Sequence, residues 1–208
     1  SEMKQSKQLI YMRKIIKNLP VVGAFITNIY RFWFARSRLF PGSKNYWIQR
    51  YKAGGNSGVG SYNKLAEFKA EVLNGFVKNM NIMTVIEYGC GDGNQLKLAE
   101  YPSYIGFDVS SEVIFHCREI FNYDKFKTFR LIDECAGEKA QLTISLDVIY
   151  HLVEDDVFSE YMERLFKSSE KYVIIYSSDT DFQQNKQAAH IKHRKFSKWI
   201  SQKQQHWK

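Results

Sequence analysis

The sequence predicts an α/β fold in which a mostly parallel sheet of at least five strands carries helices on both faces. From residue 61 onward, short apolar runs of strand length alternate with segments of helical period. A glycine-rich turn follows the first of these runs, as in open α/β sheets that bind a ligand. The length of 208 residues suffices for one buried core and is too short for two full domains. A basic, helical N-terminal arm is expected to precede this fold.

The expected elements follow one another in a regular order. Residues 64–78 have the helical period, and the expected apolar face of this helix holds Leu65, Phe68, Val72, Leu73 and Phe76. The strands are expected at 84–87, 104–108, 127–132, 142–146 and 172–176. The other helices are expected at 94–100, from Ser110 or Ser111, at 155–167 and at 191–202. Single helices between strands imply parallel pairing with right-handed crossovers.

Cysteine content and hydropathy indicate the setting of the protein. Cys90, Cys117 and Cys135 are odd in number and form no C-x-x-C pair, which argues against a disulfide framework or a metal cluster. No run reaches the roughly 18–20 apolar residues that cross a bilayer. We therefore expect a cytoplasmic protein without a metal site.

Positive charge is concentrated at the two ends of the chain. The net charge is +8, yet residues 1–52 hold eleven Lys and Arg against one acid, and residues 182–208 hold seven against none. Such flanks indicate an anionic partner, which could be a phospholipid surface, a phosphorylated glycan carrier or RNA. Solvated faces that keep the chain soluble are the alternative interpretation. Peripheral membrane association is thus one expected consequence of the basic flanks.

The basic arm spans residues 3–50, with apolar residues near the helical period and a break expected at Pro20. Aromatic and basic residues mix over 31–36, which is typical of an interfacial amphipathic segment. A helical arm that packs on its own domain has the same pattern, and we favour that interpretation. The arm and the glycine-dense segment after it make up residues 1–60, and the α/β domain makes up residues 61–208.

The glycine-rich turn lies in VIEYGCGDGNQL, residues 85–96. Its glycines, Gly89, Gly91 and Gly93, allow the backbone to approach a ligand at the end of the first strand. A dinucleotide site has the pattern G-x-G-x-x-G, but here Asn94 stands where the third glycine would fall. The turn therefore indicates a different ligand.

The acidic residues around the turn indicate which ligand this is. Glu87 precedes the first glycine and Asp92 lies within the turn, where carboxylates suit a cation and repel a pyrophosphate. Asp108 ends the next strand, within YIGFDVS at residues 104–110, where it could accept both hydroxyl protons of a ribose. S-adenosylmethionine carries a sulfonium, an ammonium and a ribose, and it has no phosphate. The motif therefore predicts S-adenosylmethionine as the cofactor.

The string E-x-G-x-G-x-G followed by a strand-terminal aspartate resembles motifs I and II of the class I S-adenosylmethionine-dependent methyltransferases. This resemblance implies a Rossmann-like fold and an enzyme that releases S-adenosylhomocysteine. It also implies that Glu87, Gly89 and Gly91 line the path of the methionine and adenosine, and that Asp108 holds the ribose. The residues expected to bind the cofactor are Glu87, Gly89, Cys90, Gly91, Gly93, Asn94, Gln95, Asp108, Val109, Leu146, Trp47, Arg50 and Tyr51. Asp133 or Glu134 is the expected adenine contact.

Three longer segments look like a bacterial methyltransferase subgroup that is often encoded among glycan and cell-envelope functions. They are residues 46–74, 145–162 and 190–200. This resemblance implies a small-molecule or glycan acceptor. The glycine-dense segment 54–61 is expected to fold over the cofactor as a lid, with a flexible linker as the alternative. The lid would act together with Trp47, Arg50 and Tyr51.

Methyl transfer is an in-line displacement, so the protein supplies mainly positioning and a place for one proton. Asp147 ends the fourth strand, and His151 follows four residues later. His151 is the candidate general base, because the ordinary histidine pKa of about 6.5 suits neutral pH. Asp147 is expected to act as base or to orient His151. His151 could instead only shape the pocket, and Tyr150 could line the substrate site.

His190, His193 and Arg194 follow the fifth strand on an expected helix, near the carboxyl edge of the sheet. We expect these side chains to bind the acceptor. A metal site would need a third ligand such as Asp179 or Asp181, and an exposed basic helix is the plainer alternative.

Members of the family usually continue past the fifth strand into a sixth and an antiparallel seventh. Residues 61–208 leave little sequence for these strands, so we expect the final strands to be missing or reduced. An open sheet edge would follow, and it favours pairing with a second copy or cover by the arm. A homo-oligomer is one expected consequence.

Three functions are compatible with the sequence. The first is O-methylation of a small molecule or glycan, which the subgroup resemblance and His151 favour. The second is RNA methylation, which the basic flanks alone support. The third is a non-catalytic module that binds S-adenosylmethionine or a membrane.

Overall fold

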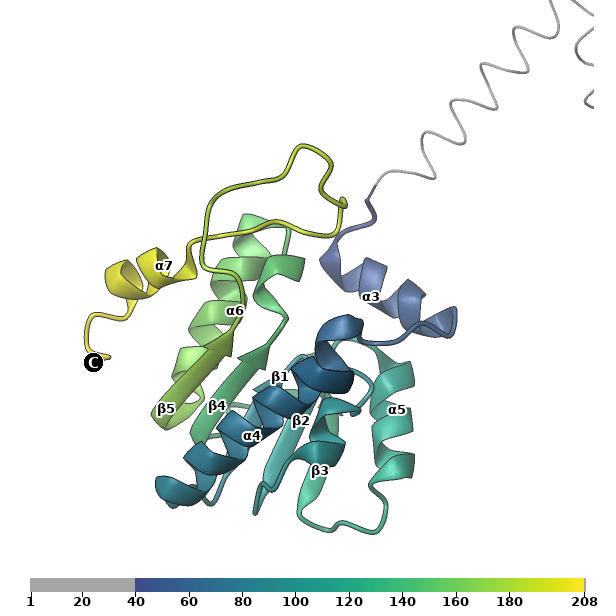
Figure 1. Cartoon of the computed structure of the whole chain (residues 1–208), viewed down its shortest axis with the longest axis vertical. Coiled ribbons are helices and arrows are strands. Elements are labelled where there is room, and N and C mark those ends of the chain that lie inside the picture. Colours follow the sequence, from purple (N-terminus) through teal and green to yellow (C-terminus); the bar gives the residue numbers. More distant parts are fainter. Residues whose placement is uncertain (1–39, 208) are drawn as a thin grey trace, which may run out of the picture. The chain divides into compact units, whose positions relative to one another are not determined.

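The computed structural model describes residues 40–207, and the chain from Pro41 onward forms one compact unit. Most of the expected basic arm lies outside the described residues. Five parallel strands form one sheet in the order β3-β2-β1-β4-β5 (Figure 1). They are β1 (Val85–Tyr88), β2 (Tyr104–Asp108), β3 (Lys127–Leu131), β4 (Ala140–Leu146) and β5 (Ser169–Tyr176). The predicted parallel sheet of five strands is confirmed.

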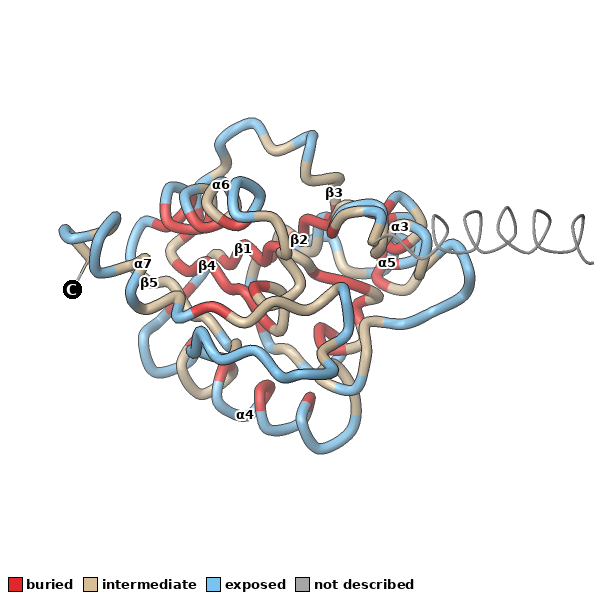
Figure 2. The backbone as a smooth tube through the Cα atoms, turned by 90° about the horizontal axis from the view of Figure 1, so that it is seen from above, coloured by how far each residue is buried: buried red, intermediate tan, exposed pale blue. Residues whose placement is uncertain are grey.

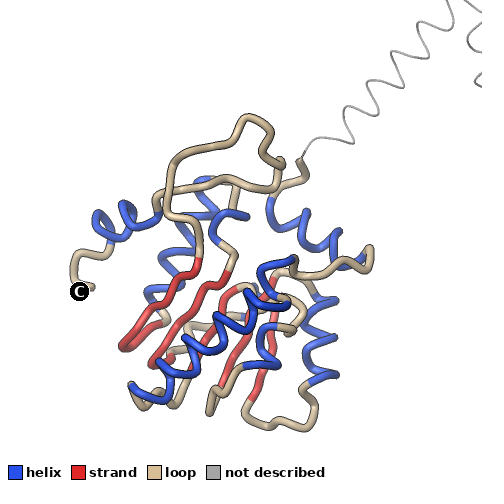
Figure 3. Tube along the Cα trace, viewed as in Figure 1, coloured by secondary structure: helices blue, strands red, loops and turns tan. Residues whose placement is uncertain are grey.

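Helices cover both faces of the sheet (Figures 1 and 3). The α-helices are α3 (Ser43–Lys52), α4 (Asn63–Asn79), α5 (Ser111–Ile120), α6 (Asp155–Lys167) and α7 (Phe196–Lys203). Helices α4 and α5 pack on one face, and α6 packs on the other. Helix α7 reaches α6 through Trp199, whose ring lies against Phe158 and Phe166. The predicted two-sided arrangement is therefore confirmed.

The central strand β1 is buried at all four positions because β2 and β4 flank it and helices cover both faces (Figure 2). On the α4 side, Val85 packs in one cluster with Leu142 and Ile144. On the α6 side, Ile86 and Tyr88 pack in another cluster that includes Leu165 of α6. Full burial of such apolar side chains contributes about 1.5–3 kcal/mol each. This rigid centre fixes the turn that leaves β1.

The expected apolar face of α4 is wrong in part. Leu65, Phe68 and Val72 are 46%, 53% and 53% exposed, whereas Leu73 is buried and Phe76 packs against the core. The buried positions have helical spacing and include two alanines; they are Ala66, Lys69, Ala70, Leu73 and Val77. Alanines let the helix backbone approach the sheet closely, which outweighs the greater apolar area of the bulky residues on the next face.

Two expected helices differ from the observed ones. The expected helix 94–100 is only the 3₁₀ turn Gln95–Leu98 (η2), because the Asn94 amide bonds to the Ser61 carbonyl and Pro102 follows. The expected helix 191–202 begins only at Phe196. Asp181 and Asp179 accept the backbone N–H groups of Lys195 and Ser197, which places the helix start there. His190, His193 and Arg194 therefore lie on a loop.

All three cysteines are free thiols, in line with their spacing. Ser110 precedes α5 as expected, but its hydroxyl donates to Glu112 and does not cap the helix. Among residues 40–207, no helix combines the length and apolarity needed to cross a bilayer.

Candidate active site

A cavity of about 340 Å³ opens at the carboxyl ends of β1, β2 and β4. This is the edge where an open parallel sheet reverses its strand order, and ligands bind there in α/β folds. Twelve of the predicted site residues line it: Trp47, Tyr51, Glu87, Gly89, Cys90, Gly91, Gln95, Asp108, Val109, Leu146, Asp147 and His151. The fold thus brings most of the predicted site together.

Two positions of the turn after β1 require glycine. Gly89 has φ +83°, and a Cβ there would lie 2.5 Å from the Val148 side chain. Gly91 has φ +57°, and a Cβ there would lie 2.3 Å from the Ser57 hydroxyl. Both positions combine a left-handed backbone with no room for a side chain. The Gly89 and Cys90 N–H groups bond to the Phe107 carbonyl, which holds the turn against β2.

Asp108 ends β2 and faces the turn with a buried carboxylate. One oxygen accepts the Gly91 N–H at 3.0 Å and the other accepts the Ser110 N–H at 3.0 Å. Burial raises the pKa of this carboxyl group to about 6, and the backbone donors oppose the rise. Each carboxylate oxygen has a second lone pair, so Asp108 can still accept hydroxyl groups from a ligand.

Glu87 lies inside the cavity wall, where it is 4% exposed. Its carboxylate accepts the Tyr104 hydroxyl at 2.6 Å. Burial raises its pKa to about 7, while the Tyr104 hydrogen bond and the charge of Lys69 lower it. A cationic ligand beside Glu87 would favour the ionised form.

Gln95 supplies a second acceptor. Its amide nitrogen donates to the Ala66 carbonyl at 3.0 Å, which fixes the orientation of the amide. The amide oxygen is buried and has no partner within residues 40–207. A buried acceptor without a donor is costly, and a ligand ammonium would satisfy it. Glu87, Gln95 and Asp108 therefore fit a ligand with an ammonium group and a ribose, as S-adenosylmethionine has.

The glycine-dense segment 54–61 is docked on the turn. Ser57 and Asp92 form a reciprocal pair: the Ser57 N–H donates to the Asp92 carboxylate at 2.9 Å, and the Asp92 N–H donates to the Ser57 hydroxyl at 2.9 Å. The Tyr62 hydroxyl adds a bond to the same carboxylate at 2.8 Å. Ser57 and Ser61 line the cavity. This placement agrees with a lid, whose function stays a prediction.

Helix α3 brings Trp47 and Tyr51 to the cavity. Its N-terminus is held by Glu154, which accepts both the N–H and the hydroxyl of Ser43, at 2.9 and 2.5 Å. Arg50 does not line the cavity: its guanidinium donates to the Asn56 carbonyl at 2.7 Å and so shapes the glycine-dense segment.

His151 lies in the short 3₁₀ turn Ile149–His151 (η4) after β4, and its ring is in edge contact with Trp47 at 4.8 Å. Its Nδ1 lies 3.1 Å from the His190 carbonyl. A carbonyl only accepts, so Nδ1 carries the hydrogen and Nε2 is left as an acceptor. Burial lowers the pKa of His151 to about 4, so the ring is neutral at pH 7.

Asp147 follows β4 with φ +60°, a left-handed conformation that costs a non-glycine residue about 1–2 kcal/mol. Its carboxylate accepts the Lys69 ammonium at 2.6 Å and the Tyr150 hydroxyl at 3.1 Å. The partner that orients His151 is thus the His190 carbonyl, and the expectation that Asp147 orients His151 is not met by these bonds.

Several predicted residues lie beside the cavity and not on its wall. Gly93 packs against α5, and Asn94 bonds to Ser61. The His190 ring stacks on His151 and on Tyr46. The His193 Nδ1 lies 2.6 Å from the Ser178 hydroxyl.

Arg194 is also buried beside the cavity. It donates to the Leu152 and Val153 carbonyls and to Asp155. Of the two expected adenine contacts, Asp133 lines the cavity and Glu134 does not.

Sequence reasoning missed several residues of the cavity wall, among them Tyr88, Phe107 and Tyr161. It also missed Lys69, which pairs with Asp147, because apolar periodicity does not identify the buried face of α4. Ser57 lies in the predicted segment 54–61, but its pairing with Asp92 left no local signal. Tyr161 left no local signal either. The Tyr161 hydroxyl lies 2.9 Å from the Tyr88 carbonyl and 2.7 Å from the Ser145 hydroxyl, contacts that only the folded chain creates.

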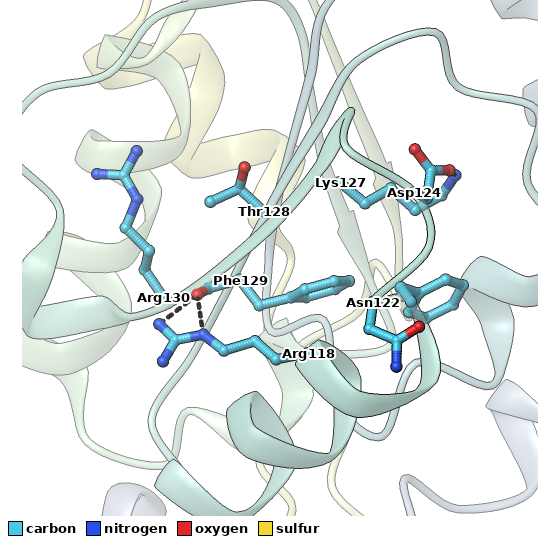
Figure 4. A pocket seen from close by; sticks show the side chains of 8 residues that line it. Arg118, Asn122, Asp124, Lys127, Thr128, Phe129 and Arg130 are labelled. Carbon is cyan, nitrogen blue, oxygen red and sulfur yellow. Dashed lines mark hydrogen bonds and ion pairs between the residues drawn. The ribbon is translucent and has the colours of Figure 1, made fainter.

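A second cleft, of about 350 Å³, lies between the end of α5 and β3 (Figure 4). It shares no lining residue with the main cavity. Its cationic side chains are engaged within the fold. Arg118 donates to the Phe129 carbonyl at 2.6 and 2.9 Å, and Lys127 pairs with Asp124. We assign no chemistry to this cleft.

Comparison with family models identifies the domain, and solved structures resemble its fold. A family model described as a methyltransferase domain matches residues 61–206. The methyltransferase domain of bacterial CtHen1 has a TM-score of 0.55 and 18% identity, over 68% of this chain and 84% of that one. DesVI of Streptomyces venezuelae has a TM-score of 0.47 and 17% identity, over 54% of this chain and 51% of that one. This chain therefore spans about half the length of DesVI.

A third structure is magnesium protoporphyrin IX methyltransferase from Synechocystis PCC 6803, which was solved with S-adenosylhomocysteine bound. It has a TM-score of 0.48 and 19% identity, over 64% of this chain and 68% of that one. Among curated proteins, none matches the sequence.

Proposed function

The chain belongs to the methyltransferase-domain family, and from this premise we propose that it methylates a hydroxyl group of a small molecule or glycan. S-adenosylmethionine is the methyl donor. The observation that carries the proposal is His151: it lines the cavity, and its Nδ1 is bound to a carbonyl, so Nε2 can accept a proton. A hydroxyl nucleophile needs such an acceptor when it is methylated.

The cofactor, when bound, supplies a methyl group on a sulfonium that an acceptor displaces in line. The chain's own residues hold it: Glu87 and the Gln95 amide oxygen would accept its ammonium, and Asp108 would accept its ribose hydroxyls. The docked segment 54–61 would exclude water from the reacting groups. Helix α3 would hold Trp47 and Tyr51 over the cofactor.

His151 is the proposed base. Its neutral ring would take the acceptor proton at Nε2 while Nδ1 stays bonded to the His190 carbonyl, which stabilises the imidazolium that forms. Asp147 is a carboxylate acceptor on the same wall, and its negative charge would favour the charged ring. Tyr150 and His190, which contact His151, are proposed to border the acceptor.

The choice of a glycan or small-molecule acceptor rests on the resemblance of residues 46–74, 145–162 and 190–200 to the subgroup linked to glycan and cell-envelope functions. The basic flanks would bring the enzyme to an anionic membrane surface or carrier. Within residues 40–207, β5 lies at the edge of the sheet and pairs with β4 alone, and such an edge supports a homo-oligomer.

The test is a transfer assay with S-adenosylmethionine labelled in its methyl group. Cell-envelope glycan fractions, small hydroxylated compounds and RNA would be tested as acceptors. The His151→Ala variant would serve as the negative control. The proposal expects label in a glycan or small-molecule fraction. Label in RNA alone, with strongly salt-dependent binding, would favour RNA methylation, which the basic flanks support. Cofactor binding without transfer to any pool would favour a non-catalytic module.

A further inference from the structure

The loop between β5 and α7, residues 177–195, crosses from the edge strand β5 to helix α3 (Figure 1). Its His190 carbonyl lies 3.1 Å from the His151 Nδ1, and within residues 40–207 this is the one hydrogen bond of the His151 ring. The acceptor is a main-chain atom, so its position is set by the contacts that hold the loop. The orientation of the His151 ring therefore depends on how residue 190 is held.

A column of aromatic rings packs residue 190 against helix α3. The His190 ring stacks on the Tyr46 ring, with 4.3 Å between centroids and 9° between planes. It also stacks on the His151 ring, with 5.4 Å between centroids and 18° between planes. Flat rings at such separations attract each other and resist sliding apart. Tyr46 thus reaches His151 through the ring of His190.

Helix α3 is a fixed support for this column. Glu154 accepts the N–H and the hydroxyl of Ser43, which holds the start of the helix at 2.9 and 2.5 Å. Trp47, the next residue after Tyr46, lines the cavity and contacts the His151 ring at 4.8 Å. Tyr46 itself does not line the cavity, so any effect of Tyr46 on the site passes through the residues that it contacts.

Hydrogen bonds also hold the loop near this point. The Lys192 N–H donates to the Tyr150 carbonyl at 2.8 Å, and the Gln187 side-chain amide donates to the Ile191 carbonyl at 2.7 Å. These bonds fix the residues that follow the His190 carbonyl. Residues 188–189, which precede it, are two exposed alanines. The ring column is therefore the contact that packs a side chain of the loop on helix α3 at this point.

From this geometry we propose that Tyr46 is a positioning residue for His151: by packing His190 it keeps the His190 carbonyl on Nδ1, and so leaves Nε2 as the proton acceptor. The proposal rests on the proposed function, in which Nε2 takes the acceptor proton. A neutral imidazole carries one hydrogen on either nitrogen, and a hydrogen bond at one nitrogen decides which. When residue 190 moves away, the hydrogen is free to shift to Nε2, where it occupies the lone pair that the reaction needs.

The experiment reads the His151 tautomer by NMR of the full-length protein, labelled with ¹⁵N in its histidine rings. The chain has five histidines, and the signals that vanish in His151→Ala belong to His151. The wild type should carry the hydrogen on Nδ1. Tyr46→Ala should show a large share of the tautomer with the hydrogen on Nε2. Tyr46→Phe keeps the stacked ring and should match the wild type, as should Gln49→Ala, an exposed change on the same helix.

Transfer kinetics give the functional readout. Tyr46→Ala should lower kcat by about tenfold to a hundredfold while the affinity for S-adenosylhomocysteine stays within about threefold, because a misplaced base slows transfer without loosening the cofactor. If Tyr46→Ala does not fold, Tyr46→Leu removes the flat ring with less loss of volume and takes its place.

An unchanged His151 tautomer in the variant without the ring would overturn the proposal. Equal losses in Tyr46→Ala and Tyr46→Phe would overturn it as well, because they would assign the effect to the hydroxyl and not to the stacked ring. Absence of transfer by the wild type to any acceptor would instead refute the proposed function, and the tautomer measurement keeps these two results separate.

Discussion

At the scale of single residues, burial governs the chemistry of the site. Glu87 and Asp108 both have raised pKa values, about 7 and about 6, because their carboxyl groups are removed from water. His151 has a lowered pKa for the same reason. The cavity therefore holds less charge at neutral pH than its acidic residues suggest, and a cationic ligand would favour the ionised carboxylates on binding.

Glu87 should couple cofactor binding to proton release. Below pH 7 the group is largely protonated in the free protein, and a bound ammonium would lower its pKa, so a proton leaves on binding. The affinity for S-adenosylhomocysteine should rise from pH 6 to pH 8. Calorimetry at pH 6.5 in two buffers of different ionisation enthalpy would measure the release. The Glu87→Gln variant should lose it, and a wild type without buffer dependence would refute the coupling.

His151 should be needed for transfer and not for cofactor binding. Because its pKa is about 4, the ring is already neutral at pH 6, and the rate should show no histidine limb between pH 6 and 8. The His151→Ala variant should lose transfer by about 10²–10⁴-fold while its affinity for S-adenosylhomocysteine stays within about threefold. Turnover near the wild-type level would remove His151 as the base.

At the scale of elements, the turn after β1 and segment 54–61 act as one unit. In Gly91→Ala the new Cβ would meet the Ser57 hydroxyl at 2.3 Å and the backbone would be strained at φ +57°. We expect a destabilisation of about 1–3 kcal/mol and weaker cofactor binding. The control is Gly75→Ala in α4, where a Cβ meets nothing within 4 Å. Chemical denaturation should show equal or greater stability for the control, and equal stability of both variants would contradict the docking.

The loop before α7 is held by Arg194, which is 8% exposed and bonds to the Leu152 and Val153 carbonyls. Arg194→Ala removes the guanidinium from these partly buried acceptors and from Asp155, and it should lower the free energy of unfolding by about 1–3 kcal/mol. Lys198→Ala, an exposed change on α7, should be neutral within about 0.5 kcal/mol. A denaturant titration measures the free energy of unfolding of both variants. An unchanged value for Arg194→Ala would contradict the prediction.

Local signals were sufficient for the strands, the glycine turn and Asp108, because each depends on residues within a few positions of one another. The buried face of α4 could not be predicted from apolar periodicity. The helix packs closely on the sheet, and the small side chains of Ala66 and Ala70 allow this approach where larger apolar side chains would not. The late start of α7 depends on Asp179 and Asp181, which approach only in the folded chain. The pairing of Lys69 with Asp147 joins residues 78 positions apart, which no local pattern shows.

At the scale of the whole molecule, the strand order places the cavity beside β1, where connections leave toward β2 on one side and β4 on the other. The groups of the site therefore come from several elements, and α3, the turn after β1, β2 and the β4–α6 connection must all be in place. A ligand that contacts them all should stabilise the entire compact unit. At a concentration of 100 times Kd this stabilisation is about 2.7 kcal/mol.

The central claim is a cavity built for S-adenosylmethionine, and its most direct test is a titration of the full-length protein with S-adenosylhomocysteine. Calorimetry should show one site per chain, with a matching rise in Tm. The Asp108→Ala variant should lose affinity by about tenfold or more, because the ribose loses its acceptor. Absence of heat and of any Tm shift in the folded wild type would contradict the account.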